Sequence, residues 1–333
     1  DLLVIKSAKK DIFIAGADIK EIEHLKTIEE AREVVAIGQK IVTSLIGMPF
    51  KSLAVIDGAC MGGGTELILS CTFRIASDGA KTKIGLPEVN LGIFPGFGGT
   101  QTLPRLVHLP SALDLILSGR ALDGKRALKM GLVDDCYPKA YEERVVEEWI
   151  EKILNNDTKA VYARRKAKKS LIEKIPLLGK FLIFRAAKKS LIEKTKGNYP
   201  APLKALEVIK RTYGGMISSG LKVELEAFLP LVTGPISKNL IDIFYTTEEI
   251  KKEYSDVEVK LPEETFLLGA GVMGGGIAWL FSNYGFNIRM KDISLKGIEI
   301  GFKQVGEIYK SLVKKRRVKP ADLTCKYARI TST

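Results

Sequence analysis

The sequence predicts an α/β protein in which two glycine-rich turns each connect a β-strand to an apolar helix. The first of these segments, residues 55–71, reads VIDGACMGGGTELILSC, with β-formers before the Asp-Gly break and a buried helix from about Thr65. The second, residues 265–288, has the same order of apolar strand, glycine turn and apolar helix. Between them, residues 141–258 are charged and helix-forming, with interrupting prolines and glycines. We therefore expect two α/β regions joined by a helical segment.

Length and composition agree with a globular chain of two or three domains. The chain has 333 residues, of which 46% are hydrophobic, and its four cysteines lack the spacing of a disulfide framework. This cysteine usage suits a reducing compartment. The two histidines, His24 and His108, lie in no metal-binding or nucleophile motif, and no CxxC or calcium-loop pattern occurs, so we expect no metal site.

Three basic runs, residues 164–169, 185–189 and 314–319, carry much of the net charge of +13. Their basic residues interleave with apolar residues at helical spacing and no aromatic ladder accompanies them, so solvated helix faces are the main interpretation. Attraction of a polyanionic ligand, binding of nucleic acid, and contact of residues 175–194 with a membrane surface remain alternatives. Residues 265–288 carry no charge and are long enough to span a bilayer, but their glycines form a phosphate-binding pattern, which argues against a membrane helix.

The first chemical signal is Glu66, which follows three consecutive glycines, Gly62 to Gly64, in the segment GGGTEL. Glycine permits backbone angles and close approaches that a side chain forbids, and the first N–H groups of the following helix have no intrahelical partner. Such N–H groups suit the binding of a developing oxyanion without a metal ion. The helix dipole favours an ionised Glu66 whereas burial favours the protonated acid, so the two effects on its pKa oppose each other.

The second signal is Glu88 in GLPEVNLGIFPGFGGTQ, where three glycines follow between positions 96 and 99. Such a loop can lay its backbone directly against a ligand. Each glutamate alone is typical of a helix start or a solvated turn. Together, two carboxylates beside exposed N–H groups can move protons at one carbon while the backbone stabilises negative charge on a neighbouring oxygen. The pair therefore predicts chemistry that passes through an enolate.

Four segments between Asp11 and Val133 carry a family resemblance: IAGADIKEI, AVIDGACMGGGTEL, GLPEVNLGIFPGFGGTQTLPRL and LSGRALDGKRALKMGLVDD. In order and approximate spacing they resemble the crotonase superfamily, specifically the hydratase portion of multifunctional fatty-acid β-oxidation α-subunits. The resemblance implies a crotonase-like β-β-α superhelix. It also implies that Glu66 and Glu88 are the acid/base pair that hydrates trans-2-enoyl-CoA to 3-hydroxyacyl-CoA. Isomerisation of the double bond by the same carboxylates remains an alternative.

The same resemblance implies roles for backbone groups. The amides of Ala17 and Gly63 map onto the family's oxyanion hole, which polarises the thioester carbonyl of the substrate. The amide of Gly96 matches the position that holds the attacking water, and Ala15 falls where the family's backbone meets the adenine of coenzyme A. A coenzyme A thioester is thus the implied substrate.

A dinucleotide-binding pattern begins at Thr265. The motif GxGxxG occurs at Gly269, Gly271 and Gly274, after a short apolar strand and at the opening of a helix. Asp292 stands 21 residues after the second glycine, at the end of a second predicted strand, where an acid accepts hydrogen bonds from the ribose hydroxyls of NAD. An aspartate here favours NAD over NADP because a 2′-phosphate would be repelled.

Residues 266–333 also resemble the opening of the 3-hydroxyacyl-CoA dehydrogenase domain that follows the hydratase in the same α-subunits. The family's catalytic histidine and its partner acid lie beyond this first β-α-β unit, so we expect this chain to lack the dehydrogenase's catalytic residues. A third strand should begin at residues 329–333, and residues 1–7 read as a strand whose preceding strands are missing. The sequence thus predicts a chain truncated at both ends, with a partial Rossmann NAD-binding unit at its C-terminus.

We expect three parts: a crotonase-like enoyl-CoA hydratase/isomerase domain over residues 1–175, a helical linker over 176–258, and a truncated Rossmann domain over 259–333. The segment KKSLIEK occurs at 168–174 and 188–194, which predicts two amphipathic helices and not a repeat array.

The resemblance implies one activity of a β-oxidation multienzyme with a thiolase β-subunit as partner, an oligomeric full-length form, and the bacterial cytoplasm in preference to the mitochondrial matrix. The alternatives are a non-catalytic scaffold that binds NAD or coenzyme A for the thiolase subunit, and a basic protein that binds nucleic acid or a membrane surface. Nucleic acid is the less favoured partner because the basic runs lack interleaved aromatic residues.

Overall fold

The computed structural model describes residues 1–167, 178–253, 260–262, 264–315 and 317–333. The chain divides into two compact units, Asp1–Lys251 and Lys252–Thr333. The three-part division remains a prediction, since both of its boundaries lie outside the described residues. Helices from the predicted linker pack within the first unit, so that this unit extends well beyond the segment in which the family motifs occur.

The first unit contains two four-stranded sheets. The first sheet is parallel throughout and has the order β1 (Leu2–Lys6), β3 (Lys51–Ile56), β5 (Phe73–Ser77), β8 (Asp135–Tyr137). The second sheet has the order β2 (Ile12–Ile14), β4 (Ala59–Met61), β6 (Lys83–Gly85), β7 (Ala121–Leu122), and only its last pair is antiparallel. From β1 to β6, successive strands along the chain therefore alternate between the two sheets, and the parallel strands with their helices confirm the predicted α/β class.

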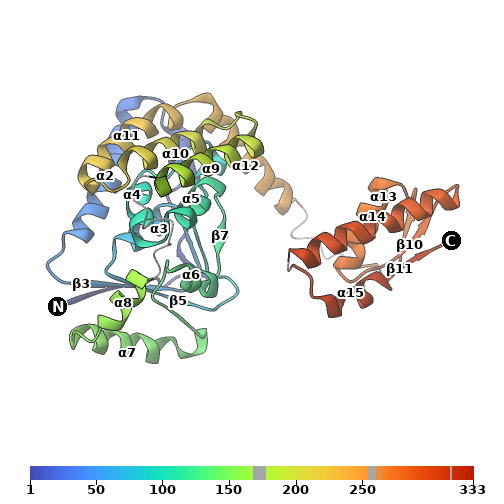
Figure 1. Ribbon diagram of the computed structural model, residues 1–333, viewed down its shortest axis with the longest axis horizontal. Helices are drawn as coiled ribbons and strands as arrows, with labels where there is room; N and C mark the ends of the chain where they lie inside the picture. Colours follow the sequence, from blue (N-terminus) through green and yellow to red (C-terminus); the bar gives the residue numbers. More distant parts are fainter. Residues whose placement is uncertain (168–177, 254–259, 263, 316) are drawn as a thin grey trace. The chain divides into compact units, whose positions relative to one another are not determined.

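Helices surround these sheets (Figure 1). They are α1 (Ile19–His24), α2 (Ile28–Ile46), α3 (Gly63–Ser70), α4 (Gly99–Leu106), α5 (Leu109–Ser118), α6 (Gly124–Met130), α7 (Glu142–Leu154), α8 (Lys159–Ala167), α9 (Leu178–Thr195), α10 (Pro200–Thr212), α11 (Ile217–Val232) and α12 (Pro235–Lys252), with the 3₁₀ helices η1 (Pro87–Leu91) and η2 (Lys139–Tyr141). Figure 1 shows α7 on one side of β3 and β5, and α2, α4, α10 and α11 on the other.

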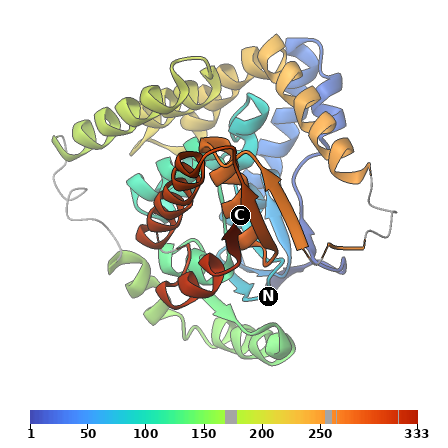
Figure 2. The ribbon, with the colours of Figure 1, turned by 90° about the vertical axis from the view of Figure 1, so that its right-hand side faces the viewer.

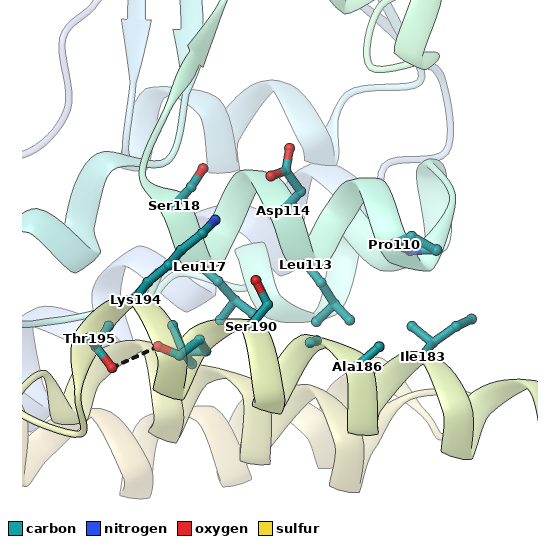
Figure 3. Close-up of a pocket in the computed structure, with 12 residues that line it drawn as sticks. Pro110, Leu113, Asp114, Leu117, Ser118, Ile183, Ala186, Ser190, Lys194 and Thr195 are labelled. Atoms are coloured by element: carbon teal, nitrogen blue, oxygen red, sulfur yellow. Dashed lines mark hydrogen bonds between the residues drawn. The ribbon is translucent and has the colours of Figure 1, made fainter. Parts of the chain in front are cut away.

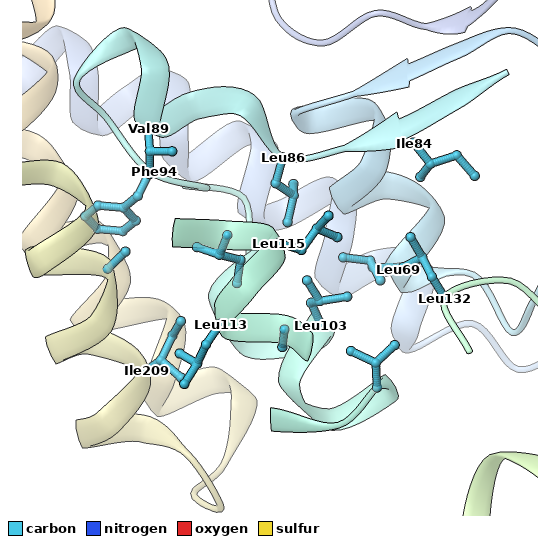
Figure 4. Close-up of a cluster of buried hydrophobic side chains, with 14 of the residues drawn as sticks. Leu69, Ile84, Leu86, Val89, Phe94, Leu103, Leu113, Leu115, Leu132 and Ile209 are labelled. Atoms are coloured by element: carbon cyan, nitrogen blue, oxygen red, sulfur yellow. The ribbon is translucent and has the colours of Figure 1, made fainter. Parts of the chain in front are cut away.

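Strand β3 separates two hydrophobic cores. Because successive side chains of a strand point to opposite faces, Leu53 and Val55 enter a cluster with buried side chains of α7, whereas Ala54 and Ile56 enter the larger cluster. In the larger cluster, Leu86, Leu115 and Ile209 come from the segment before η1, from α5 and from α10 (Figure 4). A helix of the predicted linker thus completes the core on which the glutamate-bearing segments rest.

The segment that leads to Glu66 differs from the prediction in one respect. A short strand, β4, intervenes between the Asp57-Gly58 break and the helix, and α3 begins at Gly63 instead of near Thr65. Gly62 adopts a φ of +53°, a left-handed angle that glycine tolerates without strain. The chain therefore turns directly from β4 into α3, and the helix starts two residues earlier than its apolar run suggests.

Part of the first basic run makes tertiary contacts. Arg165 donates hydrogen bonds to the carboxylate of Asp134 at 2.8 and 2.6 Å, and Arg164 donates to the backbone carbonyl of the same residue. Asp134 also forms an ion pair with Arg74, and both of these residues are buried. These two arginines of the run therefore stabilise the packing of α8 on the first unit, and residues 168–169 of the run lie outside the described residues.

The second copy of KKSLIEK lies in α9, as predicted for a helix, and the first copy lies outside the described residues. No helix in the described part of the chain combines the length and hydrophobicity that crossing a bilayer requires.

The second unit contains a parallel three-stranded sheet with two helices packed against each other beside it (Figure 2). Its elements are β9 (Glu264–Leu268), α13 (Val272–Asn283), β10 (Asn287–Lys291), α14 (Leu295–Lys314), α15 (Pro320–Tyr327) and β11 (Ile330–Ser332). The strand order is β11-β10-β9, so the first strand is at one edge and the third at the other. This is the order of the first three strands of a Rossmann sheet, and β11 is the predicted third strand.

Candidate active site

The residues predicted for the hydratase-like site all line one cavity of about 110 Å³ in the first unit. They are Ala15, Ala17, Gly63, Glu66, Glu88 and Gly96. These residues come from the segment after β2, the first turn of α3, the 3₁₀ helix η1 and the loop before α4. The fold therefore brings together groups that are widely separated in the sequence.

Glu66 is almost completely buried, with 2% of its surface exposed. Its Oε1 accepts hydrogen bonds from the backbone N–H groups of Phe97 at 2.8 Å and Gly99 at 2.7 Å. Burial raises the pKa of Glu66 to about 7, against the opposing effect of these two N–H groups. Of the two effects that the sequence left open, burial is the one that decides the direction of the shift.

Glu88 lies in η1 with both carboxyl oxygens shielded from solvent and without a hydrogen-bond partner among the described residues. Burial, then the charge of Glu66 and more weakly that of Glu224, raise the pKa of Glu88 well above its ordinary value. A Cβ atom on Gly62 would lie 3.4 Å from Oε1 of Glu88, so this carboxyl group packs against the turn that opens α3. A buried, unpartnered acid that lines a cavity is suited to bind what enters the cavity.

The backbone of Ala17 is brought to this turn by Gly16, which has a φ of +110°. A Cβ atom on Gly16 would lie 3.2 Å from the carbonyl oxygen of Met61, at the end of β4. Gly63 is the first residue of α3, where backbone N–H groups have no intrahelical acceptor. Ala17 and Gly63 therefore line the same cavity as the two glutamates, with the amide of Gly63 at the positive end of a helix.

Helix α11 contributes to this cavity, which the sequence did not predict. Phe228 lines it, and a Cβ atom on Gly96 would lie 3.1 Å from the ring of Phe228. One turn earlier, the fully buried Glu224 accepts a hydrogen bond from the N–H of Gly98 at 2.7 Å. The sequence does contain a signal for this contribution: Leu221, Glu224 and Phe228 fall on one helical face, so that an acid interrupts an apolar stripe.

The second unit brings the predicted cofactor residues together. Gly269 has a φ of +93°, and a Cβ atom on Gly274 would lie 2.1 Å from the carbonyl oxygen of Gly269, so both positions require glycine. Gly271 precedes the first residue of α13, and a Cβ atom there would meet nothing within 4 Å. Open space at a helix N-terminus suits a pyrophosphate.

Asp292 lies beside this turn, because its carboxylate accepts hydrogen bonds from the N–H of Ala270 at 2.8 Å and of Ser294 at 3.2 Å. The hydrogen bond from the N–H of Ala270 is the main reason why the pKa of Asp292 is lowered, so this carboxyl group is ionised. A carboxylate at the end of the second strand, next to the glycine turn, fits the ribose hydroxyls of NAD.

A larger cavity of about 630 Å³ lies between α5 and α9 (Figure 3). Its lining includes Leu113 and Leu117 of α5 and Ile183 and Ser190 of α9, and it contains none of the predicted site residues. Among the described residues, no group of His, Cys, Asp and Glu side chains is arranged to hold a metal ion.

Two family models match this chain. The enoyl-CoA hydratase/isomerase family model matches residues 2–191. The model for the NAD binding domain of 3-hydroxyacyl-CoA dehydrogenase matches residues 265–333. The two matches fall on the two compact units, and the resemblance that the motifs indicated is confirmed.

Similar proteins include the fatty acid oxidation complex subunit alpha of Shewanella loihica, which is 41% identical over 96% of this chain and 45% of its own length. The chain therefore spans less than half of this relative. An enoyl-CoA hydratase from Rhodobacter sphaeroides, 19% identical, superposes with a TM-score of 0.55 over 74% of this chain and 77% of that one. Human mitochondrial delta3-delta2-enoyl-CoA isomerase, 18% identical, gives a TM-score of 0.51 over 75% and 80%. At these identities the two structures show the fold alone.

The strand alternation of the first unit, its solved neighbours and the family match agree on a crotonase fold, and the second unit is a Rossmann-like NAD binding domain. The chain thus belongs to the enoyl-CoA hydratase/isomerase family.

Proposed function

We propose that the first unit hydrates trans-2-enoyl-CoA to 3-hydroxyacyl-CoA. The observation that carries this proposal is the convergence of Glu66 and Glu88 on one cavity that Ala17 and Gly63 also line. The two acids differ in their surroundings, since Glu66 accepts two backbone N–H bonds and Glu88 has no partner among the described residues. Two carboxyl groups with different surroundings suit opposite roles in proton transfer.

Glu66 acts as the base, because the N–H groups of Phe97 and Gly99 stabilise its ionised form. It takes a proton from a water molecule while the water oxygen bonds to the β-carbon of the enoyl thioester. The electron pair of the double bond moves toward the thioester oxygen and forms an enolate. The amides of Ala17 and Gly63 stabilise the negative charge on that oxygen, and the loop at Gly96 holds the water.

Glu88 acts as the acid, since burial and the neighbouring charge of Glu66 favour its protonated form. It donates its proton to the α-carbon as the enolate returns to a thioester. The product has then gained one hydroxyl group and one hydrogen. Transfer of the remaining proton from Glu66 to Glu88 restores the starting state of both acids.

Isomerisation of a 3-enoyl thioester needs the same two acids and the same amides, but no water. The two reactions are distinguished by the substrate that is consumed, so both thioesters belong in the assay.

We further propose that the second unit binds NAD through the turn at Gly269, Gly271 and Gly274 and through the carboxylate of Asp292. NAD held there would supply a hydride acceptor for the oxidation of a 3-hydroxyacyl group. Residues 265–333 contain no histidine, so the proposal for this unit is limited to NAD binding. Ala15 is proposed to meet the adenine of coenzyme A.

The relative from Shewanella loihica is named as a subunit of a fatty acid oxidation complex, and this supports a role in a multienzyme. We propose an acyl-CoA substrate, a thiolase β-subunit as partner, an oligomeric full-length form, and the bacterial cytoplasm as the compartment.

The decisive experiment measures turnover of trans-2-butenoyl-CoA and of 3-hexenoyl-CoA by the chain and by Glu88→Gln. We expect hydration by the unmodified chain and a loss of about 10²- to 10⁴-fold in kcat for the variant, with little change in KM. Glu226→Gln is the matched control, because this acid is exposed on α11 and pairs with Arg32, away from the cavity lining. Equal turnover by all three proteins would overturn the role of Glu88, and no turnover by any of them would favour a non-catalytic binding role.

A further inference from the structure

Glu224 is a buried acid for which the proposed chemistry has no proton-transfer role. It lies in α11, is fully buried, and accepts the N–H of Gly98 on Oε1 at 2.7 Å and the hydroxyl of Thr100 on Oε2. The side-chain amide of Gln39, on α2, lies 3.4 Å from Oε1 and donates at 3.1 Å to the carbonyl of Gly96. Three elements thus meet at this one carboxyl group.

The direction of the bond from Thr100 follows from its other partner. The side-chain amide of Gln101 donates to Oγ1 of Thr100 at 2.9 Å and to Oγ1 of Thr212 at 3.0 Å. Thr100 accepts that bond, so its single proton is free to be donated to Glu224. The two oxygens of the carboxyl group therefore each face a donor, the N–H of Gly98 and the hydroxyl of Thr100.

The loop in front of α4 is bound from two sides. The N–H groups of Phe97 and Gly99 point to Glu66, whereas the N–H of Gly98, between them, points to Glu224. Consecutive amides therefore alternate between two carboxyl groups on different helices. Rotation of this loop about its own axis would break bonds on both sides at once.

We propose that Glu224 is a positioning residue for the reaction at Glu66. By binding Gly98 and Thr100, it fixes the orientation in which the amides of Phe97 and Gly99 meet the catalytic carboxylate. It acts through the loop and does not touch the reacting atoms. The inference rests on the proposed hydratase function.

The test compares Glu224→Gln with Glu226→Gln, two residues further along α11. Glutamine at position 224 replaces one of the two oxygens by an NH2 group, so either Gly98 or Thr100 would face a donor in place of an oxygen. We expect kcat for trans-2-butenoyl-CoA to fall about 10- to 100-fold with KM within about threefold, since small displacements of catalytic groups act mainly on kcat. Glu226→Gln should retain both constants. Unchanged kcat in a folded Glu224→Gln protein overturns the proposal.

Two further measurements cover the other outcomes. If Glu224→Gln does not fold, Thr100→Val and Thr100→Ser decide, because valine removes the hydroxyl donor and serine keeps it. Loss of kcat in the first and retention in the second supports positioning, whereas equal kcat in both overturns it.

Amide hydrogen exchange at residues 97–99, followed by mass spectrometry, needs no turnover. Faster exchange in Glu224→Gln than in Glu226→Gln shows that Glu224 holds the loop, and equal exchange overturns this. If the unmodified chain hydrates nothing, the proposed function fails, while the exchange result still decides the role of Glu224.

Discussion

Glu66 and Glu224 hold opposite sides of one loop. Oε1 of Glu66 accepts the N–H groups of Phe97 and Gly99, and Oε1 of Glu224 accepts that of Gly98. Burial, and then the charge of Glu66, raise the pKa of Glu224 well above its ordinary value. The geometry and the electrostatics of the candidate site therefore depend on α11, a helix that lies far along the chain from the family motifs.

The pH dependence of hydration should report the two proposed catalytic acids. Glu66 must be ionised to act as base, and its pKa is raised to about 7, so kcat/KM should rise with pH up to about this value. Glu88 must be protonated, and its raised pKa should give a second, falling limb at higher pH. The two limbs belong to the coupled pair of acids. An acidic limb near pH 4 to 5, as for an ordinary glutamate, would contradict the assignment of Glu66.

Glu66→Gln should stabilise the first unit at high pH while abolishing turnover. A carboxyl group whose folded-state pKa is raised stabilises the fold below its unfolded-state pKa, and this contribution is lost as pH rises from 4.5 through about 7. The loss is of the order of 3 kcal/mol for such a shift. Glutamine does not ionise, so the variant avoids this loss of stability and keeps an oxygen acceptor for the N–H groups of Phe97 and Gly99.

Urea unfolding at pH 4.5 and pH 8 checks this prediction. At pH 8, but not at pH 4.5, the free energy of unfolding of the variant should exceed that of the unmodified chain. A difference between the two proteins that is the same at both pH values would show that the pKa of Glu66 is not raised in the folded state.

Gly99→Ala should impair both activity and stability. A Cβ atom at this position would lie 2.7 Å from Cβ of Pro95 and 2.9 Å from Oε1 of Glu66, so the loop or the catalytic carboxyl group must move. We expect a loss of about 1–3 kcal/mol in free energy of unfolding and a lower kcat. Gly306→Ala is the matched control, because a Cβ atom there meets nothing within 4 Å and alanine favours the helix α14. Thermal unfolding and kcat of both variants test the prediction.

Asp292→Asn should weaken NAD binding by the second unit. Asparagine has one acceptor oxygen in place of two, and a hydrogen bond to a charged group contributes about 1.5–3 kcal/mol, so we expect Kd for NAD to rise at least about tenfold. Titration calorimetry of the chain with NAD measures this change. Asp322→Asn, at the start of the short helix α15, is the control and should leave Kd unchanged. Equal affinity of both variants would argue against a ribose contact at Asp292.

The turns and their neighbouring elements could be predicted from the sequence because they rest on local constraints. A φ above zero at Gly269 and the close contact between Gly274 and that residue demand glycine, and this requirement is visible in the motif itself. The strand that ends at Lys291 follows from alternating polar and apolar residues, and the helix that carries Glu66 in its first turn follows from an apolar run. Even here the start of α3 was placed too late, because a tight turn at Gly62 does not depend on hydrophobicity.

The chemical character of the site was decided by the tertiary structure. The sequence by itself determined the residue types, the glycine turns and the family of the chain, which the segments around Glu66 and Glu88 indicate. Only the fold buried Glu66 enough for desolvation to outweigh the hydrogen bonds from Phe97 and Gly99, left Glu88 without a partner among the described residues, and set Glu224 against the loop from the other side. Desolvation and charge coupling add up over all atoms near a group, and those atoms come from segments that no local pattern connects.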